Sequence, residues 1–227
     1  MYKLKNDNLD NTVSVNKKLY EKTVGEEIAN VITHGIGLLL SIAALVLLIV
    51  FACIKGDVWH IVSFTIYGVT MILVYASSTF FHAFKNYKLK KLFNLFDHSA
   101  IFLLIAGTYT PLTLVTLRGT LGWTIFGVIW GLAIFGIVMK VFFIGKRRVL
   151  SALLFVAMGW MIVLAAKPLI ANMDVEGLWL LLAGGLSYSF GVIFYLWKSL
   201  PYSHSIWHLF VLGGTICHFF AILLYVL

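Results

Sequence analysis

The sequence predicts an all-α integral membrane protein with seven transmembrane helices. Of its 227 residues, 61% are hydrophobic and only 11% are charged, whereas a soluble domain carries about 25% charged residues. A soluble core cannot absorb so much apolar surface, so a large part of that surface must face lipid. The charged residues also lie almost entirely between long apolar runs, as in a multi-pass membrane protein.

Seven apolar runs are long enough to cross a hydrocarbon layer about 30 Å thick, which takes about 20 helical residues. In chain order we expect them at residues 28–54, 58–84, 95–117, 121–139, 149–167, 178–197 and 205–227. Helices are the expected spanning element, because backbone groups in lipid must be satisfied within their own segment. The runs lack the alternating pattern of a membrane β-barrel.

The residues before the first run form a hydrophilic segment, 1–27, with five lysines and five acidic residues. The first apolar run is too long for a cleavable signal and lacks a convincing cleavage site, so we expect it to remain as a membrane span. The expected organisation is a cytoplasmic N-terminal segment over 1–27 and a seven-helix transmembrane domain over 28–227.

The orientation of the spans follows from their basic residues, because cytoplasmic loops of membrane proteins are enriched in Lys and Arg. With the N-terminus inside, only Lys55, Arg118 and Lys167 fall on the outer side, and the other 14 of the 17 fall on the inner side. We therefore expect a cytoplasmic N-terminus, an external C-terminus and a place in the cytoplasmic membrane of a bacterium. The same bias accounts for the net charge of +8, so we expect no nucleic-acid partner.

Ionisable side chains inside spans are costly and usually functional. Asp97 is the single acid within the expected spans, near the start of the third. His82 lies at the inner end of the second span, and His204 and His208 lie in the first turns of the seventh. The alternating direction of the spans brings these three histidines and Asp97 to one depth.

The spacing of these residues indicates a metal site. His204 and His208 are four residues apart, so both imidazoles lie on one helix face and can reach one ion. Three imidazoles with an oxygen ligand suit tetrahedral zinc. A site with one open position would be catalytic, with Asp97 as a general base or as an orienting group for water. Ser78, one turn before His82, can hydrogen-bond that water or a reacting carbonyl.

Further polar residues share this inner level. Glu26, Glu27, Asn30 and His34 lie on neighbouring turns at the start of the first span, where they can cap the helix, support the metal ligands or handle protons. His98 is an additional candidate for a ligand or a proton-handling group.

Four motifs carry a resemblance to a known family. They read Glu-Glu-Ile-Ala-Asn-Val-Ile-Thr-His-Gly over residues 26–35, Ser-Thr-Phe-Phe-His over 78–82, Asp-His-Ser-Ala-Ile over 97–101 and Ser-His-Ser-Ile-Trp-His over 203–208. In this combination, and over nearly the whole chain, the sequence resembles the haemolysin III branch of the progestin and adipoQ receptor family. The superfamily to which that family belongs includes the alkaline ceramidases.

The resemblance implies seven helices with a cytoplasmic N-terminus and a zinc ion near the inner leaflet. His82, His204 and His208 would be its ligands. Asp97 would act through a water on the zinc or directly on the metal, with Ser78 nearby. Members of the superfamily hydrolyse lipid amides with a metal, and ceramide-like lipids are the clearest substrate class. In two respects the chain departs from the eukaryotic receptors: His98 stands where tyrosine is usual, and the N-terminal segment is far shorter, so hormone sensing is not implied.

Two functions fit these residues. The first is a zinc-dependent membrane hydrolase that acts on a ceramide-like lipid amide or ester near the cytoplasmic leaflet. The second is a non-enzymatic haemolysin III-type membrane protein, in which structural zinc fastens three helices and the role lies in membrane homeostasis, sensing or cytolysis. A retinal protein is excluded, because residues 204–227 contain no lysine for a Schiff base. Membrane lipid is the expected partner, and the oligomeric state is left open.

Overall fold

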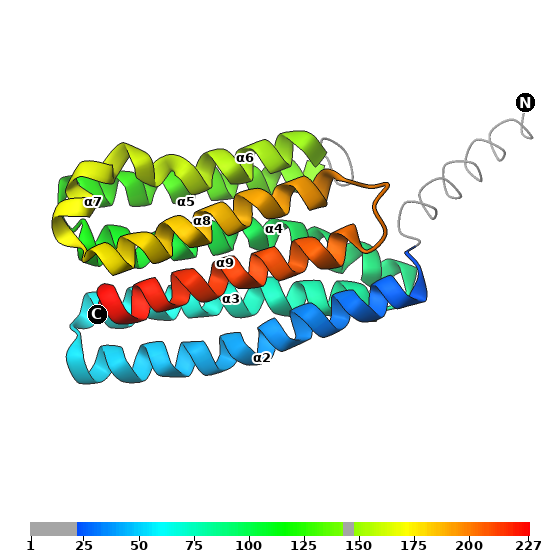
Figure 1. The fold of residues 1–227 in the computed structure, drawn as a ribbon, viewed down its shortest axis with the longest axis horizontal. Helices are drawn as coiled ribbons and strands as arrows, with labels where there is room; N and C mark the ends of the chain where they lie inside the picture. Colours follow the sequence, from blue (N-terminus) through cyan, green and yellow to red (C-terminus); the bar gives the residue numbers. More distant parts are fainter. Residues whose placement is uncertain (1–21, 143–147) are drawn as a thin grey trace, which may run out of the picture.

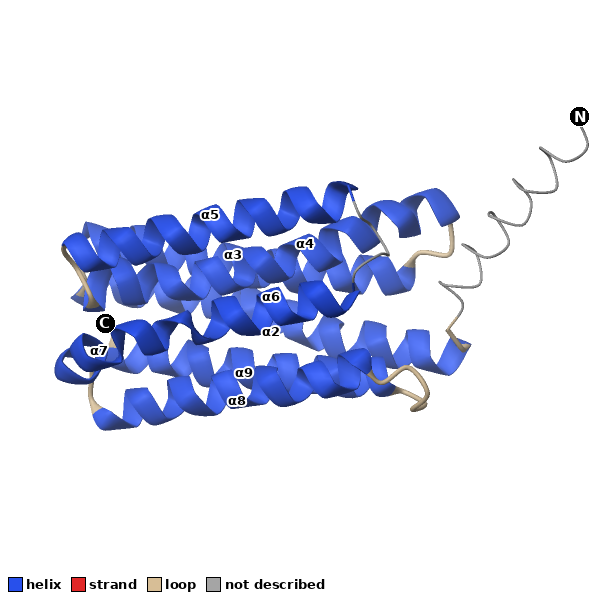
Figure 2. Ribbon diagram, turned by 90° about the horizontal axis from the view of Figure 1, so that it is seen from above, coloured by secondary structure: helices blue, strands red, loops and turns tan. Residues whose placement is uncertain are grey.

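Helices make up all the regular structure in the computed structural model, which describes residues 22–142 and 148–227 (Figure 2). Within these residues, seven helices are long and apolar enough to span a membrane, so the all-α, seven-span prediction is confirmed. Most of the expected N-terminal segment, namely residues 1–21, lies outside the described residues, as do Lys146 and Arg147 of one basic linker.

The spans follow one another with short connections. Their bounds are α2 (Val24–Lys55), α3 (Val58–Ala83), α4 with the π-helical turn η1 (Tyr87–Pro111 and Leu112–Thr116), α5 (Thr120–Phe142), α6 with the 3₁₀ turn η2 and the short α7 (Arg148–Trp160, Met161–Ala165 and Ala166–Asn172), α8 (Val175–Leu196) and α9 (Ser203–Tyr225). Two of the seven spans are thus built from more than one kind of helix.

Side-chain caps fix the start of the first three spans. Thr23 accepts a hydrogen bond from the backbone N–H of Glu26, and the Glu26 carboxylate accepts one from the N–H of Thr23 in return, which forms a capping box. Asp57 and Asn86 cap α3 and α4 in a similar way. These caps satisfy backbone donors that have no partner in the first helical turn.

The interior of the bundle is built around α3 and α4, the two most buried spans. Phe64, Tyr67 and Met71 of α3 are almost completely buried and pack in one cluster with Leu48 of α2 and Ile222 of α9. Contacts between α2 and α9 bring the first and last spans together. In Figure 1 α9 runs along the bundle in front of α3, and the hydrogen bond from Tyr75 to Thr215 joins these two helices, which carry the three histidines.

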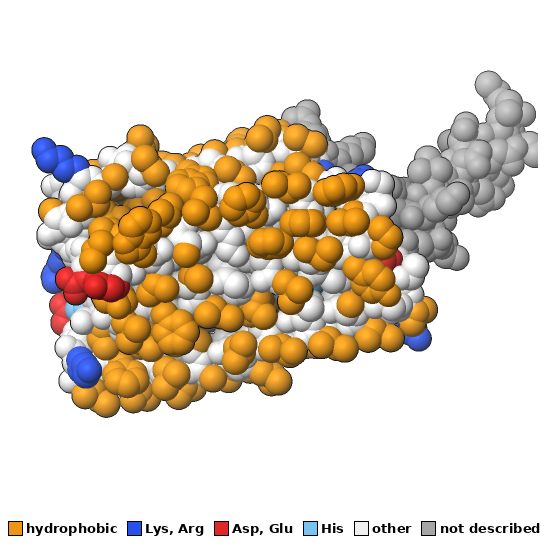
Figure 3. Space-filling view, viewed as in Figure 1, with side chains coloured by type: hydrophobic (Ala, Val, Ile, Leu, Met, Phe, Trp, Pro, Cys, Tyr) orange, Lys and Arg blue, Asp and Glu red, His pale blue; other side chains and the backbone are white. Residues whose placement is uncertain are grey.

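The outer surface of the bundle is apolar. Leu164, Leu39 and Trp179 are 83%, 70% and 64% exposed, and on the face in Figure 3 hydrophobic side chains cover the length of the bundle while charged ones lie at its two ends. An apolar surface of this extent belongs in lipid. The start of α2 and the C-terminus lie at opposite ends, as an odd number of spans requires (Figure 1). We call the end at which α2, α4, α6 and α9 begin the site end.

Candidate metal centre

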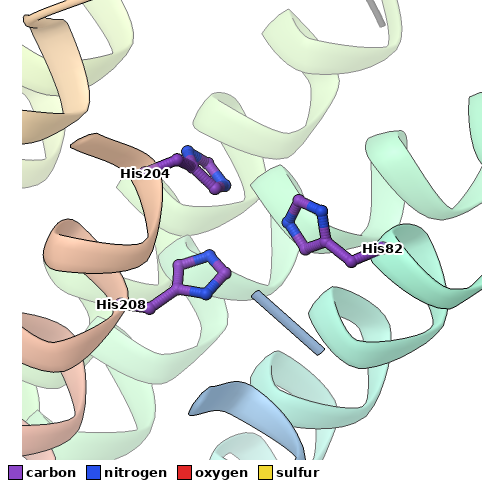
Figure 4. A group of neighbouring side chains, drawn as sticks. All are labelled: His82, His204 and His208. Carbon is purple, nitrogen blue, oxygen red and sulfur yellow. The ribbon is translucent and has the colours of Figure 1, made fainter. Parts of the chain in front are cut away.

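Three histidines from two spans meet near the site end. His82 comes from the last turn of α3, and His204 and His208 come from the first two turns of α9. Their ring centroids lie 4.5 to 5.3 Å apart, and one ring nitrogen from each lies within 4.8 Å of the others. The close-up in Figure 4 shows the rings converging on a common point between the two helices.

Glu27 fixes the protonation of His82. Nδ1 of His82 lies 2.6 Å from Oε2 of Glu27, and a carboxylate only accepts hydrogen bonds, so Nδ1 carries the proton and donates it. Nε2 of the same ring is left with its lone pair, and this atom is buried without a hydrogen-bond partner. The other oxygen of Glu27 accepts from Lys90 of α4, which holds the carboxylate in place.

Thr33 fixes the protonation of His208 in a similar way. The Thr33 hydroxyl donates its single proton to the Ala29 carbonyl, 2.8 Å away. It must therefore accept at the 3.1 Å contact with Nδ1 of His208, which leaves Nε2 of His208 unprotonated. That nitrogen is also buried and without a partner, and so is Nε2 of His204.

The histidine cluster therefore has the properties of a metal site. Buried polar atoms are normally hydrogen-bonded, yet three ring nitrogens face one another here with no donor between them. In known sites a metal-ligating histidine donates its second nitrogen to a carboxylate or another acceptor, as His82 and His208 do here. His82, His204 and His208 can thus bind a metal ion as a group.

Asn30 ties the helices around this cluster. It is completely buried, its Oδ1 accepts from the Ser205 hydroxyl at 2.6 Å, and its Nδ2 lies 3.5 Å from Nδ1 of His82. Asn30 therefore hydrogen-bonds α2 to α9 and packs against His82 of α3. Glu26 has a different place: its carboxylate closes the capping box and accepts from the backbone N–H of Tyr202 at 3.1 Å, without touching the histidines.

Asp97 and Ser78 are both buried at this level. Oδ2 of Asp97 and the hydroxyl of Ser78 have no hydrogen-bond partner, although Ser78 lies close enough to act on the Asp97 carboxyl group. The next residue, His98, is partly exposed and donates from Nδ1 to the Asn94 carbonyl at 2.9 Å. His98 therefore lies beside Asp97 and outside the histidine cluster.

His34 completes the group from α2. Its ring stacks on His208 with centroids 3.5 Å apart, and it meets Tyr75 edge-on at 5.1 Å. Both ring nitrogens of His34 are buried and unpartnered. Gly37, one turn further along α2, permits this close packing, because a Cβ there would lie 2.5 Å from the Tyr75 ring.

Comparison with known proteins places this arrangement in a family. The family model described as haemolysin-III related matches residues 22–219, which include every residue of the cluster. The chain belongs to the haemolysin-III related family. It is 55% identical over 204 residues to Hemolysin-3 of Bacillus cereus, covering 90% of this chain and 93% of that one.

Two further relatives show the breadth of the family. The Hemolysin-3 homolog of Bacillus subtilis is 53% identical over 203 residues, covering 89% of this chain and 95% of that one. The human monocyte to macrophage differentiation factor is 29% identical over 211 residues, covering 89% and 85%. The resemblance inferred from the four motifs is thereby confirmed.

In this haemolysin-III related chain a cavity opens beside the cluster. Its volume is about 110 Å³, and it lies between α4, α6, α8 and α9. Asp97, His34 and Trp207 line one part of it, and Tyr109, Trp160 and His218 are also in its lining. Most other lining residues are aliphatic, so the cavity offers an apolar space next to an unpartnered carboxylate.

The sequence pattern did not single out Glu27 and Thr33. Glu27 stood in one group with Glu26, Asn30 and His34, with the same expected role for all four. Helical spacing alone does not separate them, because Glu26 and Glu27 lie four and three residues before Asn30, and both spacings place a side chain on its face. In the fold, Glu27 reaches His82, whereas Glu26 stays at the helix start. Thr33 was missed because a threonine within an apolar helix usually bonds only its own backbone.

Proposed function

We propose that this haemolysin-III related protein is a zinc-dependent membrane hydrolase that acts on a lipid amide or ester, of the ceramide-like class, at the cytoplasmic leaflet. The observation that carries the proposal is the set of three buried, unpartnered histidine nitrogens, together with the buried Asp97 carboxylate, which interacts with Ser78 one turn before His82 and lines an apolar cavity. The distribution of Lys and Arg supports the cytoplasmic position of the site end.

Zinc is the favoured metal because of the donor set. Imidazole nitrogens are ligands for zinc, and three protein ligands leave a coordination position open, as in catalytic zinc sites. Glu27 supports this choice, since a carboxylate on the far nitrogen of a histidine is common in zinc sites. A bound zinc ion supplies Lewis acidity toward a carbonyl group or a water molecule.

The side chains of the protein have separate tasks in this proposal. Asp97, with Oδ2 free, accepts a proton from the attacking water and later returns it to the leaving group. The Ser78 hydroxyl donates to the reacting carbonyl oxygen or to the water. Glu27 and Thr33 keep His82 and His208 in the tautomer that leaves Nε2 unprotonated. The apolar cavity takes part of an acyl chain and excludes bulk water.

A second function is favoured by the name of one relative. Hemolysin-3 of Bacillus cereus is named for lysis, and a protein with that role needs no hydrolytic step. In this alternative zinc fastens α3 to α9, and Asp97 serves as a fourth ligand. The protein then acts in membrane homeostasis, sensing or cytolysis.

Asp97→Asn separates the two proposals, because asparagine keeps the size of aspartate and removes its basic carboxylate. We expect zinc to remain bound while hydrolysis of a short-chain ceramide in detergent falls by about 100-fold or more, the usual scale for a lost general base. Ser78→Ala should give a smaller loss with zinc retained. Asp57→Asn is the matched control, since Asp57 lies at the opposite end and asparagine also caps a helix. Zinc-loaded parent protein that is inert towards ceramides, acyl amides and phospholipid esters would establish the structural alternative.

A further inference from the structure

Three basic side chains near the site end are withdrawn from water. Lys140 near the end of α5 is only 6% exposed. Nζ of Lys22, just before α2, and Nε of Arg148, at the start of α6, are buried without hydrogen-bond partners. By contrast, Lys88 and Lys91 at the start of α4 are exposed, as expected for lysines whose role is to orient spans. Membrane topology alone therefore does not explain the burial of Lys22, Lys140 and Arg148.

These three cations come from separate segments at the same end of the bundle. All three have an electrostatic effect on His98, and Lys22 and Lys140 have one on Asp97. In Figure 1 the described start of the chain and the starts of α6 and α9 lie at the same end of the bundle. The three segments are distant in sequence, so the fold itself gathers the positive charge.

Packing connects Arg148 to the histidine cluster through two aromatic side chains. Its guanidinium lies 4.1 Å from the centroid of the Tyr195 ring and donates to the Tyr195 carbonyl. The ring of Tyr195 packs on Trp207, 5.0 Å away, and Trp207 lies 5.0 Å from His204. The Tyr195 hydroxyl is buried and lies close enough to Arg148 to accept from its guanidinium, while its own proton has no acceptor.

The protein's own acids do not balance this charge. Glu27 is already engaged by Lys90 and His82. Among residues 22–142 and 148–227, no ion pair joins Asp97 to a lysine or arginine. Burial lowers the pKa of Lys22 to about 8. The charge of Arg148 also lowers this pKa, whereas the charges of Glu27 and Asp97 raise it. Unpartnered buried charges and donors are unfavourable, so an acceptor from outside the protein would stabilise this group.

We propose that Lys22, Arg148 and the Tyr195 hydroxyl form a subsite for the phosphate of a membrane lipid, whose acyl part occupies the adjoining apolar cavity. Three donors lack acceptors here, and phosphate oxygens accept strongly from ammonium and guanidinium groups. A lipid is favoured over a soluble anion because Asp97, beside the cations, also lines the apolar cavity. The inference rests on the proposed function and narrows its lipid to an amide or ester that carries a phosphate, which a simple ceramide lacks.

The test measures lipid binding separately from hydrolysis. The full chain in detergent is titrated with short-chain phosphatidic acid, with diacylglycerol of the same chain length, and with inorganic phosphate. The rise in thermal midpoint gives an apparent affinity. We expect phosphatidic acid to stabilise the protein and the other two compounds, at equal concentration, to have little effect. The titrations are made with zinc-loaded and with chelator-treated protein. A lack of hydrolysis then counts against the proposed function, whereas a lack of lipid binding counts against the subsite.

Variants that remove a charge identify which residues bind the lipid phosphate. Lys22→Gln and Arg148→Gln should each weaken phosphatidic acid binding by about tenfold, as expected for a lost hydrogen bond between charged groups. Lys91→Gln removes an exposed lysine at the same end and should leave binding unchanged. Tyr195→Phe keeps the ring against Arg148 and should weaken binding about threefold, so it tests the subsite even if a charge variant does not fold. Arg148→Lys should retain most of the affinity.

Four results would overturn the inference. One is equal stabilisation by diacylglycerol, which would show that phosphate is not recognised. Another is effective competition by inorganic phosphate, which would replace the lipid with a soluble anion. The third is an equal loss of affinity in Lys91→Gln, which would indicate general surface attraction. The last is unchanged affinity in folded Lys22→Gln and Tyr195→Phe proteins.

Discussion

At the scale of single residues, the Glu27 carboxylate decides which nitrogen of His82 is available to a metal. It holds the proton on Nδ1, 2.6 Å away, and thereby leaves a lone pair on Nε2. The neighbouring Glu26 has the same charge and length but serves only the helix start and the N–H of Tyr202. These two residues therefore form a matched pair for experiment.

Glu27→Gln should reduce zinc affinity by about 10- to 100-fold, the usual effect of removing a carboxylate behind a metal-binding histidine. Glutamine can still accept from Nδ1 but supplies no negative charge. Competition with a chromophoric chelator measures the affinity. Glu26→Gln should keep the affinity of the parent, and an equal loss in both variants would show that the carboxylate acts on the site only through overall charge.

His82→Ala, His204→Ala and His208→Ala should each lower the zinc content from about one ion per chain and lower the thermal midpoint, because a metal that binds only the folded state stabilises it. Elemental analysis and thermal denaturation provide the two measurements. His60→Ala is the control, since His60 lies at the opposite end beside Asp57. Full zinc content in all three cluster variants would exclude this site.

At the scale of helices, the approach of α2 to α3 sets the position of His34. A Cβ at Gly37 would lie 2.5 Å from the Tyr75 ring, whereas a Cβ at Gly35 would have its nearest neighbour, in Thr79, at 4.0 Å. Tyr75 is buried and donates to Thr215 at 2.8 Å, so its ring has little freedom to give way.

Gly37→Ala should therefore destabilise the protein by about 1–3 kcal/mol, the usual cost of overpacking a core. Gly35→Ala should leave stability unchanged or raise it by up to about 1 kcal/mol, because alanine is the better helix former. Thermal unfolding in detergent measures both variants. A larger loss for Gly35→Ala than for Gly37→Ala would contradict the packing described for these two helices.

Hydropathy predicted the existence of every span, because lipid demands about 20 apolar residues in each. It did not predict the helix ends. α4 begins at Tyr87, although its apolar run starts near residue 95, because Asn86 caps it and the polar turns lie outside the apolar layer. The meeting of His82 with His204 and His208 was predictable from span direction and depth. The separation of Glu27 from Glu26, and the burial of Lys22 and Arg148, depend on helix rotation and packing, which composition does not encode.

At the scale of the whole molecule, the alternating spans and the basic residues together predict an orientation that reporters can test. Reporters fused after Lys91 and after Arg148 should give cytoplasmic signals, and one fused after Asp174 should give an external signal. Lys91 lies in the first turns of the third span, Arg148 is the first residue of the fifth, and Asp174 directly precedes the sixth. A cytoplasmic signal from the Asp174 fusion would invert or break the seven-span topology.

The division of the histidines between α3 and α9 has a consequence for how the protein is made. One histidine of the cluster lies in the second span, and the other two lie in the last. Spans emerge from the ribosome in order, so the complete set of three exists only after the C-terminal span has been synthesised and packed against α2 and α3. Metal binding by the complete cluster would therefore be a late, post-insertion event, and a nascent chain that stops before Ser203 holds a single ligand. Bound metal would thus mark chains in which α9 has been inserted and packed.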